Sequence, residues 1–283
     1  MWRGLSAVGS LSAELLLLRR RAANWILLAI AVVLTLFFAY VLPYYAYVSD
    51  SGAPGFRTEL SALLPEGFVA TLASGFPFYL GILGLILGVL VFGSEYGWAT
   101  LKTTLMQRPG RVRWLLAKLG ALAIAVVVAT VAVYASGALV SVAVALREGA
   151  AITWPSAGEI LRGMGAGWLI MALWTLLGVL LAVLSRGTAL ALGLGILYGL
   201  VVEGLVSGFG NSIALLHDVS LAFLRTNAYS LVAPLTGRTT EAGGPGVFNG
   251  PFVDPWQALV VIAGYIVVFA GVSAVVLARR DVT

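Results

Sequence analysis

Six long apolar runs dominate the pattern of hydrophobic and polar positions along the chain. A helix needs roughly 20 residues to cross the ~30 Å hydrocarbon core of a membrane, and each run is about that long or longer. The third run exceeds that length at about 1.5 Å per residue, so it must tilt or project past the membrane. We therefore expect membrane-spanning helices at residues 24–42, 70–92, 114–146, 160–184, 188–207 and 256–278.

The segment before the first run, residues 1–23, has apolar residues at steps of three and four from Leu5 to Leu18. The basic sequence Arg19-Arg20-Arg21 follows. An apolar stripe next to a cluster of arginines is typical of a helix that lies on an anionic membrane surface. We expect an interfacial helix there.

The segment between the fifth and sixth runs, residues 208–255, is harder to interpret. Its moderately apolar part contains His217, Asp218, Arg225 and Asn227. Each charge at the centre of a membrane costs about 2.5–3.5 kcal/mol, which disfavours a seventh span. We expect a re-entrant or interfacial helical segment on the outer side instead. The predicted fold is an all-α membrane protein with one transmembrane domain over residues 1–283.

Composition and charge agree with this fold. Hydrophobic residues make up 60% of the chain and charged residues only 10%, whereas a soluble domain has about 25% charged residues. The net charge of +5 is explained by topology and does not indicate a nucleic-acid partner. Most of the 17 basic residues fall in segments that share one side of the membrane if the N-terminus is cytoplasmic. The positive-inside rule therefore predicts that both termini are cytoplasmic.

Residues for catalysis or nucleotide binding are scarce. Neither Lys102 nor Lys118 follows a glycine, so the chain has no P-loop lysine to bind phosphates. There is no cysteine, and a zinc site or a Ser-His-Asp centre would depend on His217, the single histidine. We expect no catalytic or metal-binding residue, so the energy for any transport must come from a partner or from an ion gradient.

Glu203 is the one ionisable residue that is well placed inside a span. It could contact an ion or a substrate, which would suit a gradient-driven carrier or channel. It could also snorkel outward or pair with Arg162 or Arg225. A third possibility is an intramembrane enzyme that uses His217 or Glu203.

Several glycines lie four residues apart inside the predicted spans. This spacing lets helices approach closely in lipid, and we expect it to serve packing within one protomer more than contacts between protomers. The pairs are Gly84/Gly88, Gly163/Gly167, Gly195/Gly199 and Gly204/Gly208.

Polar chemistry concentrates after the second span, at residues 94–107. We expect a short helix with Trp98, Leu101 and Leu105 on one stripe and Lys102 on another face. The sequence Pro109-Gly110 would end it.

Within this segment, Glu95, Thr100, Leu101 and Lys102 form a pattern that Arg108-Pro109-Gly110-Arg111 follows. The pattern resembles the stretch after the second span of ABC-2 type permeases, the membrane subunits of bacterial ABC exporters. Ala99 stands where that family usually has glycine. The plan of an interfacial helix, six spans and a long outer segment between spans five and six is similar as well.

The resemblance implies a membrane subunit in the bacterial cytoplasmic membrane that pairs with a second permease and with a separate ATPase subunit in two copies. ATP and Mg would be bound by the ATPase, and this chain would carry no cofactor. Residues 94–107 would be the coupling helix, seated in the ATPase. Its contacts would come from Glu95, Trp98, Thr100, Leu101, Lys102, Leu105, Arg108 and Arg111.

In that family the substrate path lies between the second and fifth spans of the two protomers. The resemblance therefore implies that aromatic and acidic residues of these spans are candidates to line the path. They are Phe76, Phe78, Tyr79, Tyr198 and Glu203. The sequence does not identify the substrate.

Overall fold

The computed structural model describes residues 7–49, 59–97, 111–210, 214–237 and 252–279, which form helices and connecting turns without a strand. Six helical segments of this part of the chain are long and apolar enough to cross a membrane, which confirms the all-α fold with six spans. They are Ala22–Val48, Pro65–Tyr96, Arg113–Glu148, Ala157–Ser185, Thr188–Val206 and Pro255–Arg279.

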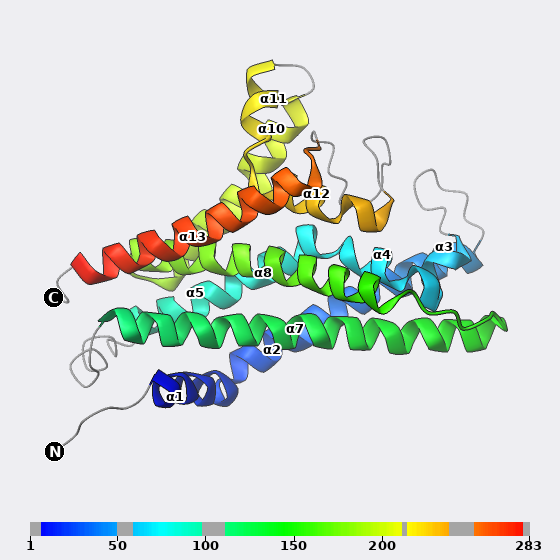
Figure 1. Cartoon of the computed structure of the whole chain (residues 1–283), viewed down its shortest axis with the longest axis horizontal. Helices are drawn as coiled ribbons and strands as arrows, with labels where there is room; N and C mark the ends of the chain where they lie inside the picture. Colours follow the sequence, from blue (N-terminus) through cyan, green and yellow to red (C-terminus); the bar gives the residue numbers. More distant parts are fainter. Residues whose placement is uncertain (1–6, 50–58, 98–110, 211–213, 238–251, 280–283) are drawn as a thin grey trace.

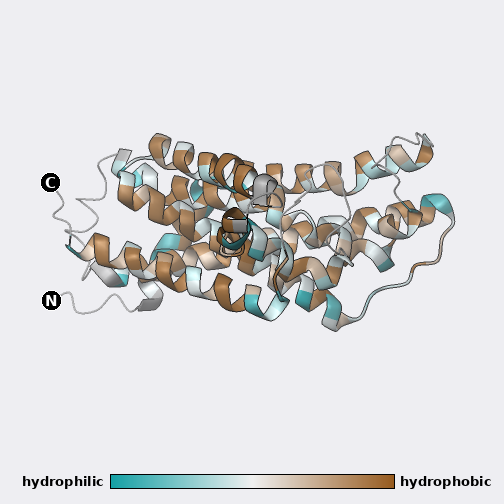
Figure 2. Cartoon of the chain, turned by 90° about the horizontal axis from the view of Figure 1, so that it is seen from above, coloured by the Kyte–Doolittle hydropathy of each residue, from teal (hydrophilic) through white to brown (hydrophobic). Residues whose placement is uncertain are grey.

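The spans lie side by side in an elongated bundle, with both termini at the same end (Figure 1). Hydrophobic residues run along most of the length of the long helices (Figure 2). The helical elements are, in chain order, α1 (Ala7–Arg20), α2 (Ala22–Leu36), η1 (Phe37–Val41), α3 (Leu42–Val48), η2 (Leu60–Leu63), η3 (Pro65–Gly67), α4 (Phe68–Ala73), η4 (Phe76–Leu80), α5 (Gly81–Gly97), α7 (Arg111–Glu148), α8 (Ala157–Ser185), α9 (Thr188–Ile196), η5 (Leu197–Val202), α10 (Glu203–Gly210), α11 (Ala214–Ser220), α12 (Leu224–Thr236) and α13 (Pro255–Arg279). Of these, η1, η4 and η5 are π-helical turns, and η2 and η3 are short 3₁₀ turns.

The core of the bundle is the contact between α5 and α8, and glycines make it possible. A Cβ atom on Gly88 would lie 2.0 Å from the carbonyl oxygen of Thr175, and one on Gly178 would lie 2.2 Å from that of Leu85. Gly84 faces the backbone of Met171 in the same way. Because no side chain separates them, the two backbones approach closely, which confirms packing within the protomer for the Gly84/Gly88 pair.

Three spans contain a π-helical turn. In the second span, Pro77 has no backbone N–H to donate, and the Leu80 N–H donates to the carbonyl of Gly75, five residues earlier, at 3.2 Å. In the first and fifth spans, the N–H groups of Leu42 and Glu203 donate to carbonyls five residues earlier. Such turns widen a helix locally and are frequent at functional sites.

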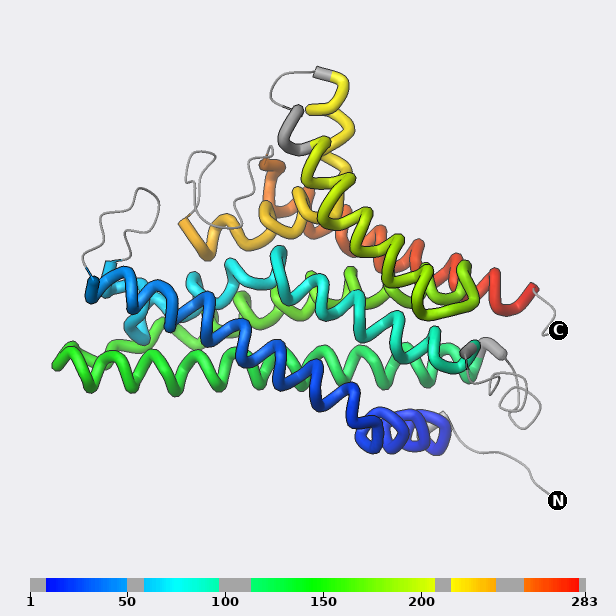
Figure 3. The backbone as a smooth tube through the Cα atoms, turned by 180° about the vertical axis from the view of Figure 1, so that it is seen from behind, coloured from blue at the N-terminus to red at the C-terminus, as the bar shows by residue number. Residues whose placement is uncertain are grey.

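The described residues between spans five and six form the short helices α10, α11 and α12. In Figure 3, α10 and α11 rise away from the bundle, whereas α12 returns to it. α12 contacts α13, α8 and α4, and its buried residues include Thr226, Asn227 and Ser230. This segment therefore adds a polar but buried helix to the apolar bundle.

Candidate functional site

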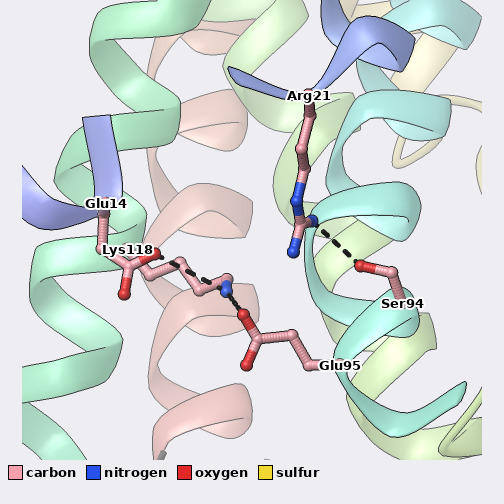
Figure 4. A network of polar contacts seen from close by, with 5 residues as sticks. All are labelled: Glu14, Arg21, Ser94, Glu95 and Lys118. Atoms are coloured by element: carbon pink, nitrogen blue, oxygen red, sulfur yellow. Dashed lines mark hydrogen bonds and ion pairs between the residues drawn. The ribbon is translucent and has the colours of Figure 1, made fainter. Parts of the chain in front are cut away.

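A buried ionic cluster lies at the end of the bundle where both termini are found. Lys118 on α7 forms an ion pair with Glu95 at the end of α5, and its Nζ lies 3.7 Å from Oε2 of Glu14 on α1 (Figure 4). Arg21, between α1 and α2, donates a hydrogen bond of 2.9 Å from Nη1 to Oγ of Ser94. The cluster of Glu14, Glu95 and Lys118 therefore joins three helices that are far apart in the sequence.

Aromatic rings complete the surroundings of the Lys118 ammonium. Its Nζ lies 5.3 Å from the ring centroid of Phe92 and 4.9 Å from that of Trp114. The Lys118 side chain is only 2% exposed. A cation this deeply buried needs compensating partners, and the two carboxylates and two ring faces supply them.

The expected docking residues are placed only in part. The helix of the second span continues to Gly97, so residues 94–97 belong to α5 and do not begin a separate helix. Glu95 is 5% exposed and faces Lys118, so the prediction that it contacts an ATPase directly is not supported. Arg111 begins α7. The other predicted docking residues lie outside the described residues: Trp98, Thr100, Leu101, Lys102, Leu105 and Arg108.

Sequence reasoning did not find the cluster. From the sequence, Lys118 is one of 17 basic residues whose distribution is explained by topology, and Glu14 lies within residues 1–23, where an interfacial helix is expected. A signal was present, because Lys118 follows Trp114-Leu115-Leu116-Ala117 and precedes a long apolar run. An ionisable residue inside a span usually has a buried partner.

The path candidates of the second span differ in exposure. Phe76 is fully buried between α7 and α8, because it stacks on Tyr134 with centroids 6.0 Å apart and fills the space above Gly167. Phe78 and Tyr79 are half-buried, and Tyr79 stacks on Phe38 of the first span at 5.6 Å. Phe76 therefore serves the core of the protomer, and Phe78 and Tyr79 remain partly accessible.

The candidates of the fifth span are joined to each other and to α12. Glu203 accepts hydrogen bonds from the backbone N–H groups of Leu224 at 2.9 Å and Arg225 at 3.0 Å, and it also forms a hydrogen bond with Tyr198. The Tyr198 ring lies 6.4 Å from that of Phe223. Because Glu203 is 0% exposed, the alternative that it snorkels outward is wrong.

The arrangement makes Glu203 a cap for the first turn of α12. Carboxylates are favourable there because the first N–H groups of a helix have no partner within the helix. Further hydrogen bonds fix the turn between α11 and α12. Asn227 donates to the carbonyls of Leu221 and Phe223, and Tyr265 of α13 donates to the carbonyl of Ala222. The described geometry gives Glu203 a structural role.

His217 gives the enzyme alternative no support. It lies on α11, and the neighbouring Ser220 hydroxyl donates to its backbone carbonyl at 2.7 Å, not to its ring. Among the described residues no group of three or more His, Asp or Glu side chains could hold a metal ion.

Comparison with known proteins identifies the family. A family model described as an ABC-2 family transporter protein matches residues 10–202, well over half of the chain. The match includes Glu14, Glu95 and Lys118 and ends just before Glu203. A search of curated proteins found no match. The chain therefore belongs to the ABC-2 family of transporter proteins, as a multi-pass membrane permease.

Proposed function

We propose that this permease is the membrane subunit of an ATP-driven exporter and docks a separate ATPase through residues 94–107. The observation that carries the proposal is the family match over residues 10–202, together with six helices that could span a membrane. The sequence has no P-loop lysine, so ATP and Mg would be bound by the partner.

The ionic cluster gives the docking segment a mechanical connection to the bundle. Residues 98–110 join α5 to α7, and Glu95 and Lys118 tie these two helices together close to that segment. Glu14 adds α1 to the same cluster. A displacement imposed by an ATPase on residues 98–110 would therefore move α5, α7 and α1 as one unit. Glu95 and Lys118 are positioning residues in this proposal, and the docking contacts belong to Trp98, Leu101 and Leu105.

The proposed orientation puts the cluster and both termini at the cytoplasmic face of a bacterial membrane. Two permeases and two ATPases would assemble, with the substrate path between spans two and five of the protomers. Phe78, Tyr79 and Tyr198 are half-buried in one protomer and suit such a path. Phe76 and Glu203 are fully buried and would support it from behind.

The gradient-driven alternative is less well supported by the geometry. It needs Glu203 to be open to an ion, whereas the Glu203 oxygens accept hydrogen bonds from the first turn of α12. We therefore favour an ATPase as the source of energy.

Co-purification from the native host tests the proposal. A tagged chain, cross-linked in the membrane, should retain a separate polypeptide that hydrolyses ATP. The double variant Trp98→Ala/Leu101→Ala should lose that polypeptide. The matched control Leu139→Ala/Trp154→Ala likewise replaces one leucine and one tryptophan, at two exposed positions outside the docking segment, and should keep it. Recovery of no ATPase, or equal recovery from both double variants, would contradict docking through this segment.

A further inference from the structure

A groove runs along the side of the bundle between α1, α2 and α7, with α5 and α8 beneath it. Its volume is about 350 Å³, and all of the side chains that line it are apolar except Arg19 and Asn24. Three of the lining residues are alanines, Ala31 on α2 and Ala125 and Ala129 on α7.

The corner between α1 and α2 fixes the basic end of the groove. At this corner the side chain of Asn24 donates to the carbonyl of Leu18 at 2.8 Å, and the Trp25 indole donates to that of Arg19 at 2.7 Å. Arg19 and Arg20 occupy the last turn of α1, and both are exposed. Trp25, which is 55% exposed, also lines the groove. The groove therefore has Arg19 and an indole at one end, and Arg20 follows Arg19 in the same turn of α1.

The groove extends from this corner into the apolar part of the bundle. Along α2 it runs from Asn24 to Ala31, about 10 Å at 1.5 Å per residue. On α7 its lining runs from Ile124 to Ala129, about 8 Å. One leaflet of a ~30 Å hydrocarbon core is about 15 Å deep. The groove thus covers about two thirds of the depth of one leaflet.

We propose that this groove binds an acyl chain of an anionic phospholipid, whose phosphate lies against Arg19 and Arg20. An acyl chain fills an apolar groove without leaving a polar group unsatisfied, and guanidinium groups pair favourably with phosphate. Tryptophan is enriched at the level of lipid headgroups, which suits Trp25. The bound lipid contacts both α1 and α7. The site does not depend on ATPase docking, so either idea can fail without the other.

Native mass spectrometry of the full chain tests headgroup recognition. The chain is released from nanodiscs made of equal parts phosphatidylglycerol and phosphatidylcholine, and bound lipids are counted. We expect one preferentially retained phosphatidylglycerol per protomer. Arg19→Gln and Arg20→Gln should each weaken its retention about fivefold. The control Arg279→Gln removes a charge from the last turn of α13 and should change nothing. Equal retention of both lipids, or no effect of Arg19→Gln and Arg20→Gln, would overturn the proposal.

A second pair of variants tests the groove. Ala129→Phe fills it and should abolish preferential retention of phosphatidylglycerol. Ala135→Phe adds the same ring to an exposed position of α7 and should not. If Ala129→Phe lowers the melting temperature, Ala129→Leu provides the same test with less added volume. Preferential retention that survives both substitutions at Ala129 would show that the lipid binds elsewhere.

Discussion

Lys118 illustrates how one residue organises the end of this bundle. Its ammonium is shared by Glu95 and Glu14 and lies between the rings of Phe92 and Trp114. Both carboxylates are buried, so the loss of Lys118 would remove a cation that the two of them share. Loss of one partner from such a cluster costs far more than loss of a surface ion pair.

We predict that Lys118→Met lowers the free energy of unfolding by about 3 kcal/mol or more. Arg113→Gln also removes one positive charge from the first turns of α7, but Arg113 is exposed, so the change should be within about 0.5 kcal/mol. Thermal unfolding of the purified proteins in one detergent measures the difference. Equal melting temperatures for the two variants would show that the cluster does not stabilise the fold.

The triple variant Glu14→Gln/Glu95→Gln/Lys118→Met tests whether charge is the reason. Replacing a whole buried ionic cluster by neutral residues is often nearly neutral for stability. We therefore expect the triple variant to regain most of the stability that Lys118→Met loses. If the triple variant is as unstable as Lys118→Met, the lost stability comes from packing around the aliphatic part of the Lys118 side chain and not from charge.

The partners within this cluster could not be predicted from the sequence. Glu95 stands out in the sequence as part of a family-like motif, but its partner Lys118 does not. Glu14, Glu95 and Lys118 are separated by long stretches of chain, and only helix packing brings them together. Lys118 within an apolar run signals a buried partner but does not say which acid it is.

At the scale of elements, the close contact between α5 and α8 depends on the absence of a side chain at Gly88 and Gly178. Gly178→Ala would push a methyl group against the carbonyl of Leu85. Overpacking of this kind costs about 1–3 kcal/mol. Gly165→Ala, on the same helix, meets no atom within 4 Å and should be neutral or slightly stabilising. The melting temperature should therefore fall for Gly178→Ala and stay the same or rise slightly for Gly165→Ala. If they fall equally, the loss of a glycine as such is responsible, and close packing is not.

A second prediction at this scale concerns α12. Removal of the Glu203 carboxylate leaves two backbone N–H groups buried without their acceptor, which should cost about 2 kcal/mol. The chain has no cysteine, so Ala228→Cys, at a fully buried position of α12, gives a background-free reporter. Maleimide labelling of this cysteine should accelerate by roughly thirtyfold in Glu203→Ala, if labelling follows local opening.

The control for this labelling is Glu59→Ala, which removes an exposed acid in the same reporter background. It should leave the rate unchanged. An unchanged rate in Glu203→Ala as well would contradict the role of Glu203 as the cap of α12.

The existence of the spans was predictable, and their local irregularities were not. Long apolar runs determine that a helix crosses the membrane, so all six were found. Five of the six spans are longer than their apolar runs, because polar ends such as Ser94–Gly97 continue the helix beyond the apolar stretch. The π-helical turn at Pro77 and the burial of polar α12 depend on tertiary packing, and hydropathy alone does not report them.

At the scale of the whole molecule, one end of the bundle holds α1, both termini, the ionic cluster and the junctions with residues 98–110. The other end holds α3 and the start of α8 (Figure 1). In the proposed mechanism, an ATPase acts at the first end and the bundle transmits its motion. The family could be predicted from the sequence motif in residues 95–111. The described structure adds that the Glu14–Glu95–Lys118 cluster connects the start of that segment to α1 and α7.

The proposed contact between residues 94–107 and an ATPase can be tested by site-specific photo-cross-linking. A benzophenone amino acid at Leu101, introduced in the native host, should form an adduct with a separate polypeptide that carries a P-loop. The same probe at Ile152, an exposed residue at the other end of the bundle, should form none. Absence of that adduct at Leu101, or the same adduct from Ile152, would contradict the account.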